Sequence, residues 1–199
     1  MSMLYPRVDK EGKLVDDNQM VSAREHLYAR HRIIVLTGEI TGETSSTDLL
    51  LALDSLDHAP IKMLITSQGG LLDATFLLCD TFNLTQSPIW TIGRFCCSGA
   101  TLLLAAGNRR YLFPSARVML HLPSGMLSGD SRDIRIQQEE MTKRQDEIIS
   151  LLQEHGVKKS KEEILVDIDR DYWMSPAEAI EYGLADEIVT PEIVKGWLT

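Results

Sequence analysis

The stretch GRFCCSGATLLLAAGNRRYLFPSARVMLHLP, residues 93–123, determines how the chain is organised. It places Ser98 just before an apolar helical segment, LLLAAG, and then passes through a basic turn at 108–110 into an apolar strand that ends at His121. Two reactive side chains therefore stand where buried segments reach the surface, and rigid scaffolds usually present catalytic groups from such places. This arrangement is typical of the core of a serine hydrolase.

The segment upstream alternates between strand and helix patterns. Short apolar runs predict buried strands, and helical spacing of apolar residues predicts the helices between them. The expected strands are 32–38, 61–65 and 89–92, and the expected helices are 44–56 and 71–84. The sequence TSQGG at 66–70 predicts a turn that closes the second strand. This alternation predicts an α/β fold with a parallel sheet and crossover helices.

The segment downstream of His121 contains the longest periodic stretch of the chain. Residues 124–129 predict a loop or strand, and residues 130–155 predict a helix whose apolar side chains form only a narrow stripe. Such a helix cannot be buried within its own domain, so we expect it to project and to find a partner in an oligomer. A short helix at 160–168, a turn at 169–173 and a helix that begins at Ser175 follow.

Composition excludes several classes of function. The chain has 199 residues and a net charge of -9, which argues against nucleic acid because phosphates require a basic surface. We find no apolar run long enough for a transmembrane helix and no signal peptide, so no membrane association is expected. The three cysteines do not form a disulfide or zinc pattern, which favours a reducing cytoplasm. Residues 1–25 have weak periodicity and are expected to form an N-terminal arm.

Ser98 and His121 could form a catalytic relay with a carboxylate, because a serine hydroxyl needs a base and the base needs an orienting group. Other roles are possible: Ser98 could be only a helix N-cap, and His121 could be a structural hydrogen-bonding residue. Spacing alone does not select the carboxylate. The candidates are Asp133, Asp167, Asp169 and Asp171.

Glycines near Ser98 suggest an oxyanion hole. Ser98 at a helix start would present the free amide of Gly99, and a donor from the turn containing Gly69 and Gly70 could complete the site. The GxSxG elbow of the α/β-hydrolases is absent. We interpret Cys96 and Cys97 as small side chains that pack behind the serine.

Together these segments resemble the proteolytic subunit of the Clp protease, a self-compartmentalised serine peptidase. The resemblance runs from about residue 32 to residue 189. Its pieces are LTGEI at 36–40, the strand with GG at 69–70, SGA at 98–100, AAG at 105–107, RVMLHLP at 117–123 and DRDYWMSPAEAIEYGLADEI at 169–188.

The resemblance implies a fold and a set of site residues. The fold would be of the ClpP/crotonase type, with repeated ββα units in one peptidase domain at 26–199 and a projecting handle at 124–156. Residues 1–25 would be an N-terminal arm or axial loop, and their sequence is unlike that of the family. The implied catalytic triad is Ser98, His121 and Asp171, the implied oxyanion-hole donors are the backbone amides of Gly70 and Gly99, and the implied residues that couple stacked rings are Asp169 and Arg170.

The resemblance also implies partners. Two heptameric rings would stack as a tetradecamer, fed with unfolded proteins by an AAA+ unfoldase ATPase, and would need no metal or other cofactor. Three departures from the family pattern stand out. Gly99 replaces the usual methionine after the serine, Gln68 replaces a proline, and Lys62 and Leu64 replace aromatic residues of the unfoldase-docking cleft.

Two other functions are compatible with these departures. The chain could be a mainly structural or weakly active subunit of a mixed ring with a paralogue. It could also be a crotonase-type acyl-CoA enzyme, which would use carboxylates in place of a Ser-His pair.

Overall fold

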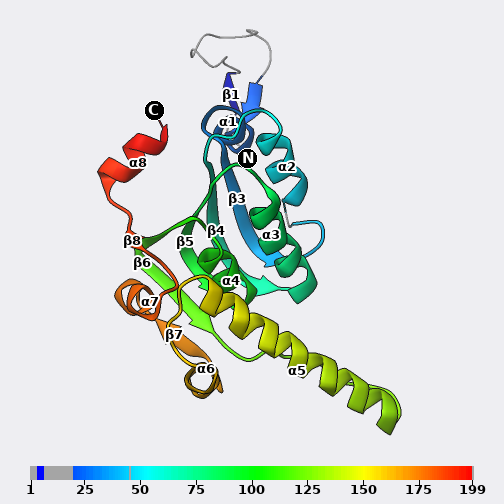
Figure 1. Cartoon of the computed structure of the whole chain (residues 1–199). Coiled ribbons are helices and arrows are strands. Elements are labelled where there is room, and N and C mark those ends of the chain that lie inside the picture. Colours follow the sequence, from blue (N-terminus) through cyan, green and yellow to red (C-terminus); the bar gives the residue numbers. More distant parts are fainter. Residues whose placement is uncertain (1–3, 7–19, 45, 199) are drawn as a thin grey trace.

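A sheet of six strands forms the centre of the chain, in the order β3-β4-β5-β6-β7, with β8 also paired to β6 (Figure 1). The computed structural model describes residues 4–6, 20–44 and 46–198. The strands are β1 (Leu4–Pro6), β2 (Met20–Ser22), β3 (Ile33–Ile40), β4 (Ile61–Gly70), β5 (Ile89–Cys97), β6 (Arg109–Leu120), β7 (Tyr172–Met174) and β8 (Glu187–Ile188). The helices are α1 (Ala23–His31), α2 (Thr47–Asp54), α3 (Leu72–Leu84), α4 (Gly99–Ala105), α5 (Ser131–Glu154), α6 (Lys161–Asp167), α7 (Pro176–Tyr182) and α8 (Pro191–Leu198).

The strands β3, β4, β5 and β6 run parallel to one another. The helices α2, α3 and α4 connect them, which confirms the predicted α/β fold with crossover helices. Because parallel strands all end at the same edge of the sheet, residues that follow β5 and β6 are brought together there.

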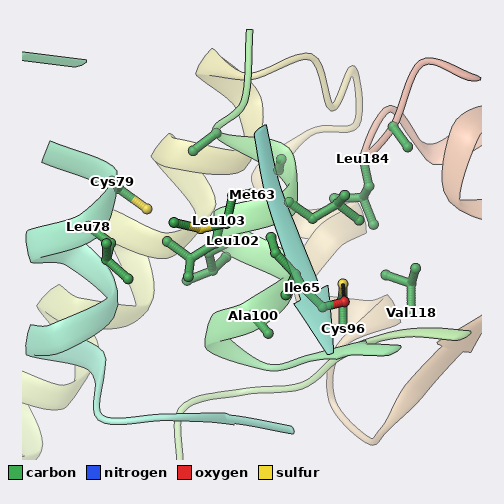
Figure 2. Packing of buried hydrophobic residues seen from close by; sticks show 14 of the residues in the cluster. Met63, Ile65, Leu78, Cys79, Cys96, Ala100, Leu102, Leu103, Val118 and Leu184 are labelled. Carbon is green, nitrogen blue, oxygen red and sulfur yellow. Dashed lines mark hydrogen bonds between the residues drawn. The ribbon is translucent and has the colours of Figure 1, made fainter. Parts of the chain in front are cut away.

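The main core lies between this sheet and the helices α2, α3 and α4. Alternate side chains of β4, namely Ile61, Met63 and Ile65, are fully buried on that face. Figure 2 shows Met63 and Ile65 close to Leu102 and Leu103 of α4. The opposite face is covered at one end by α8, whose Trp197 lies edge-on to Tyr111 with 5.4 Å between ring centroids.

Three strands are longer than the sequence predicts. The expected turn at 66–70 is wrong, because these residues continue β4 as far as Gly70. Similarly, β5 extends to Cys97, and β6 begins at Arg109 within the expected basic turn. The cause is tertiary: β5 pairs with Thr66 and Ser67, and β3 pairs with Gly69 and Gly70. This pairing outweighs the local turn preference of the two glycines.

The C-terminal and N-terminal regions also differ from expectation. The predicted turn at 169–173 is wrong in its second half, because Tyr172–Met174 form β7, antiparallel to β6. The helices α1 and α8 were not predicted. Within the expected arm, β1 and β2 pair with each other and α1 begins at Ala23; residues 1–3 and 7–19 lie outside the described residues.

Helix α5 projects from the body of the chain, as its narrow stripe predicts (Figure 1). Its buried side chains are Ile148, Ile149 and Leu152, all in the second half of the helix. The Asp130 side chain caps the distal end by accepting the backbone amides of Arg132 and Asp133, at 2.8 Å and 3.2 Å.

Candidate active site

Ser98 occupies the single residue between β5 and α4, with a backbone conformation that L-amino acids rarely adopt. Its φ is 55° and its ψ is -125°, and its side chain makes no cap hydrogen bond to the helix. Ser98 is therefore not a helix N-cap of the usual kind, which has extended backbone and a bonded side chain. Backbone strain of this sort costs about 1–3 kcal/mol and concentrates at active sites.

The strained turn is fixed to the neighbouring strand. The Ser98 amide donates to the Met119 carbonyl of β6 at 2.9 Å, and the Thr101 amide donates to the Ser98 carbonyl at 2.9 Å. The buried Thr101 hydroxyl lies 2.8 Å from the carbonyl oxygens of both Cys96 and Met119. These bonds hold Ser98 beside the end of β6.

His121 follows the last residue of β6, two positions after the carbonyl that accepts the Ser98 amide. Ser98 and His121 line one small pocket. Its other lining residues are Leu72, Gly99, Leu102, Leu120, Pro123 and Ile148. The structure thus brings the predicted nucleophile and the predicted base together in a pocket that is mostly apolar.

Asp171 lies just before β7, next to the end of β6. The antiparallel register pairs Leu120 with Tyr172, so the next positions along the two strands are His121 and Asp171. A further bond, from the Leu122 amide to the Ile168 carbonyl at 3.1 Å, holds the two segments together beyond the last pair. In the described chain no hydrogen bond joins the side chains of Ser98, His121 and Asp171, and their catalytic roles stay a prediction.

The cysteines before Ser98 are buried and protonated. Burial, and in second place the charge of Asp171, raises the pKa of the Cys97 thiol to about 11. Burial raises the pKa of Cys96 still further. Thiols with such pKa values are poor nucleophiles near neutral pH, which fits their interpretation as packing residues.

The other candidate carboxylates have different surroundings. Asp133 lies in the first turn of α5, at the distal end of the projecting helix (Figure 1). Asp167 is bound by the Lys159 ammonium at 2.6 Å and by the Tyr182 hydroxyl at 3.1 Å. Asp169 is exposed and has Arg170 4.0 Å away. Among the four candidates, the strand register favours Asp171 as the neighbour of His121.

The glycines of β4 and α4 allow very close backbone approaches. A β-carbon on Gly69, whose φ is +91°, would lie 2.6 Å from the Cys97 carbonyl oxygen and 2.9 Å from the Gly99 nitrogen. Gly70 lies against the backbone of Ile40 in β3. The Gly69 amide already donates to the Ser67 hydroxyl at 3.0 Å. The end of β4 therefore touches the Ser98 turn, and the oxyanion-hole roles of Gly70 and Gly99 stay a prediction.

Thr75 of α3 is a residue at the site that the sequence did not reveal. It is fully buried, and its hydroxyl oxygen would lie 2.5 Å from a β-carbon on Gly99. The same hydroxyl donates to the Leu71 carbonyl at 3.1 Å. Thr75 fills the space that the side chain of a larger residue at position 99 would need. The presence of glycine directly after Ser98 is therefore explained by the packing of Thr75.

Neither a metal centre nor a membrane span is found within the described residues. No group of three or more His, Cys, Asp or Glu side chains there could hold a metal ion. No helix in that part of the chain is long and apolar enough to cross a bilayer.

A family model and two curated proteins that are similar to this chain all belong to Clp proteases. The Clp protease family model matches residues 16–192. The chain is 36% identical over 169 residues to the chloroplastic ATP-dependent Clp protease proteolytic subunit 4 of Arabidopsis thaliana, covering 82% of this chain and 58% of that protein. It is 36% identical over 170 residues to the ATP-dependent Clp protease proteolytic subunit 1 of Rhodopirellula baltica, covering 82% and 74%. The chain therefore spans less than two thirds of the plant relative's length.

Proposed function

Because the chain belongs to the Clp protease family, we propose that it is the proteolytic subunit of an ATP-dependent Clp protease. In this role it is a serine endopeptidase that hydrolyses unfolded proteins to short peptides. The observation that carries the proposal is the strained, uncapped Ser98 in one pocket with His121. A strained serine without a capping role is typical of a nucleophile.

The proposed chemistry is acyl transfer. The Ser98 hydroxyl attacks the scissile carbonyl, His121 accepts its proton and later donates it to the leaving amine, and Asp171 orients the imidazole. The amides of Gly70 and Gly99 stabilise the oxyanion. Water then attacks the acyl enzyme: His121 accepts a proton from the water and donates it to the Ser98 oxygen, which releases the peptide acid. The step needs no metal or cofactor.

The proposed assembly is a pair of stacked heptameric rings that encloses the active sites, with an AAA+ unfoldase as the ATP-dependent partner. Exposed apolar side chains on and beside α2 and α3 support association with other copies, because such surface is unfavourable in water. They are Leu49, Leu51, Leu56, Leu77 and Leu84. The projecting half of α5 offers a second contact surface. We place the assembly in the cytoplasm, or in a plastid as for the plant relative.

Asp169 and Arg170 are proposed to couple assembly to activity. Both are strongly exposed and belong to the same short loop as Asp171. A contact between a neighbouring ring and Arg170 would thus shift Asp171 directly through the backbone, because the two residues are adjacent in the chain.

A second candidate function is a structural or weakly active subunit of a mixed ring. The replacement of the usual methionine by Gly99, backed by Thr75, favours it because the pocket beside the serine differs from that of the family. The match to the Clp protease family disfavours an acyl-CoA enzyme.

Labelling with a fluorophosphonate separates the two functions. The purified oligomer is treated with the probe and digested, and the labelled peptide is identified by mass spectrometry. An active subunit is labelled at Ser98, and Ser98→Ala abolishes both labelling and hydrolysis of a fluorogenic peptide. An assembled wild-type oligomer that takes no label would overturn the enzymatic proposal and favour the structural subunit.

A further inference from the structure

The loop that carries Asp171 is anchored at both ends by one tyrosine. We call residues 168–171, between α6 and β7, the acid loop. At its start, the Asp167 carboxylate accepts the Tyr182 hydroxyl at 3.1 Å. At its end, the ring of Tyr172 packs against the ring of Tyr182, with 5.7 Å between centroids. Tyr182 therefore contacts the residue before the acid loop and the residue after it.

Tyr182 is itself held in a rigid frame. It is the last residue of α7, and it is 7% exposed. The carbonyl oxygen of the next residue, Gly183, accepts a hydrogen bond from the Arg110 guanidinium at 2.7 Å, and this bond fixes the end of α7 to β6. Lys159 lies 4.6 Å from the centre of the Tyr182 ring and binds Asp167 at 2.6 Å. The position of Tyr182 is thus fixed by Arg110 of β6, and the Lys159 ammonium lies over the tyrosine ring.

The surroundings of Tyr182 keep its hydroxyl protonated, so that it can donate a hydrogen bond. Burial, followed by the nearby charge of Asp167, raises the pKa of Tyr182 far above its usual range. The hydrogen bond to Asp167 raises the pKa of Lys159. Lys159 therefore stays cationic and Tyr182 stays protonated at neutral pH, so both donate to the same carboxylate.

The start of the acid loop is held by Ile168, which is 1% exposed and belongs to the main core, but the next two residues have little to hold them. The side chains of Asp169 and Arg170 are 72% and 95% exposed and add no packing. The Ile168 amide donates to the Ile164 carbonyl at 3.0 Å, and the Ile168 carbonyl accepts the Leu122 amide at 3.1 Å. Leu122 is the residue after His121. A shift of the start of the loop would therefore change the distance between Asp171 and His121.

We propose that Tyr182 is a positioning residue for Asp171, acting through its hydroxyl on Asp167 and through its ring on Tyr172. This inference rests on the proposed function, because it assumes that Asp171 orients His121 in peptide hydrolysis. Tyr182 does not touch substrate. It sets where the carboxylate stands relative to the imidazole.

The test compares Tyr182→Phe with Tyr111→Phe in the assembled protein, using hydrolysis of a short fluorogenic peptide without any ATPase. Tyr182→Phe keeps the ring on Tyr172 and removes only the hydroxyl. Tyr111 is an equally buried tyrosine in the separate cluster beneath α8, so its variant controls for loss of a tyrosine hydroxyl away from the acid loop. We expect kcat of Tyr182→Phe to fall about tenfold with KM little changed, and Tyr111→Phe to keep the wild-type kcat.

The pH profile distinguishes positioning from mere folding. A displaced Asp171 stabilises the imidazolium less, so the acidic limb of kcat/KM should move to lower pH in Tyr182→Phe. Asp167→Asn should reproduce both effects, and the double variant should be no worse than either single variant. An unchanged profile and kcat, or a loss that only follows the melting temperature, would overturn the inference. Absence of hydrolysis and of Ser98 labelling in the wild type would instead overturn the proposed function.

Discussion

Gly69 at the end of β4 lies directly against Gly99 at the start of α4, so closely that a β-carbon on Gly69 would stand 2.9 Å from the Gly99 nitrogen. The same β-carbon would lie 2.9 Å from Cβ of Ser98. Side-chain atoms do not approach backbone this closely without displacing it. The geometry of the nucleophile turn therefore depends on the absence of a side chain in another strand.

The first prediction concerns Gly69→Ala. The added methyl group should push the Ser98 turn away from β4 and displace the Gly99 amide, so fluorophosphonate labelling should fall by at least tenfold. The rate of labelling is measured at a fixed probe concentration on protein shown to be folded by circular dichroism.

Gly38→Ala is the matched control for that variant. Gly38 has a similar φ of +82°, but a β-carbon there would meet nothing within 4 Å. Both substitutions carry the cost of a left-handed alanine, about 1–2 kcal/mol. Equal labelling of the two variants would show that the contact with the serine turn has no effect on the site.

The second prediction concerns the relay. His121→Ala and Asp171→Asn should each lower kcat for peptide hydrolysis by about 10³–10⁴-fold, because each removes a member of a unit that acts together. Neither change creates a buried cavity, so the melting temperature should stay close to that of the wild type. A loss smaller than tenfold in Asp171→Asn would mean that another carboxylate orients the histidine.

Much of this site could be predicted from residues 93–123, and the reason is local. Ser98 and His121 end two adjacent buried strands, and parallel strands must end at the same edge. The projecting α5 was also predictable, since its apolar residues are too few to bury it. These features depend on patterns within one segment.

The parts that could not be predicted depend on contacts between distant segments. The residues TSQGG have the composition of a turn, yet β3 and β5 hold them in a strand. The side chain of Thr75 matters only because α3 packs against the start of α4. The register that places Asp171 next to His121 comes from the pairing of β7 with β6, and the spacing of residues along the chain does not reveal this pairing.

The third prediction concerns assembly. The Arg170 side chain is 95% exposed and lies 4.0 Å from the Asp169 carboxylate, so Arg170→Ala should leave the stability of the subunit unchanged. If Arg170 pairs with a neighbouring ring, the variant should dissociate into single rings at a higher protein concentration than the wild type. Sedimentation velocity over a dilution series measures this, and Lys158→Ala, another exposed cation, serves as the control. Identical dissociation of all three proteins would exclude a role of Arg170 in ring stacking.

The fourth prediction concerns acid stability and Asp54, the last residue of α2. Its carboxylate accepts the backbone amides of Ser87 at 2.7 Å and Gln86 at 3.3 Å, and so ties α2 to the loop before β5. Burial alone would raise the pKa of Asp54, but the hydrogen bonds from Ser87 and Gln86 outweigh it and lower the pKa to about 2.

The sign of the pH effect follows from that depressed value. An unfolded aspartate has a pKa of about 3.9, so the ionised form of Asp54 stabilises the fold fully above about pH 4 and loses this contribution as the pH falls towards 2. Asp54→Asn should therefore lower the urea midpoint at pH 7, and the difference from the wild type should shrink steadily between pH 4 and pH 2. Asp80→Asn, at an exposed position on α3, should show no such convergence. A difference for Asp54→Asn that stays constant across this range would mean that the charge of the carboxylate contributes nothing to the tie between α2 and β5.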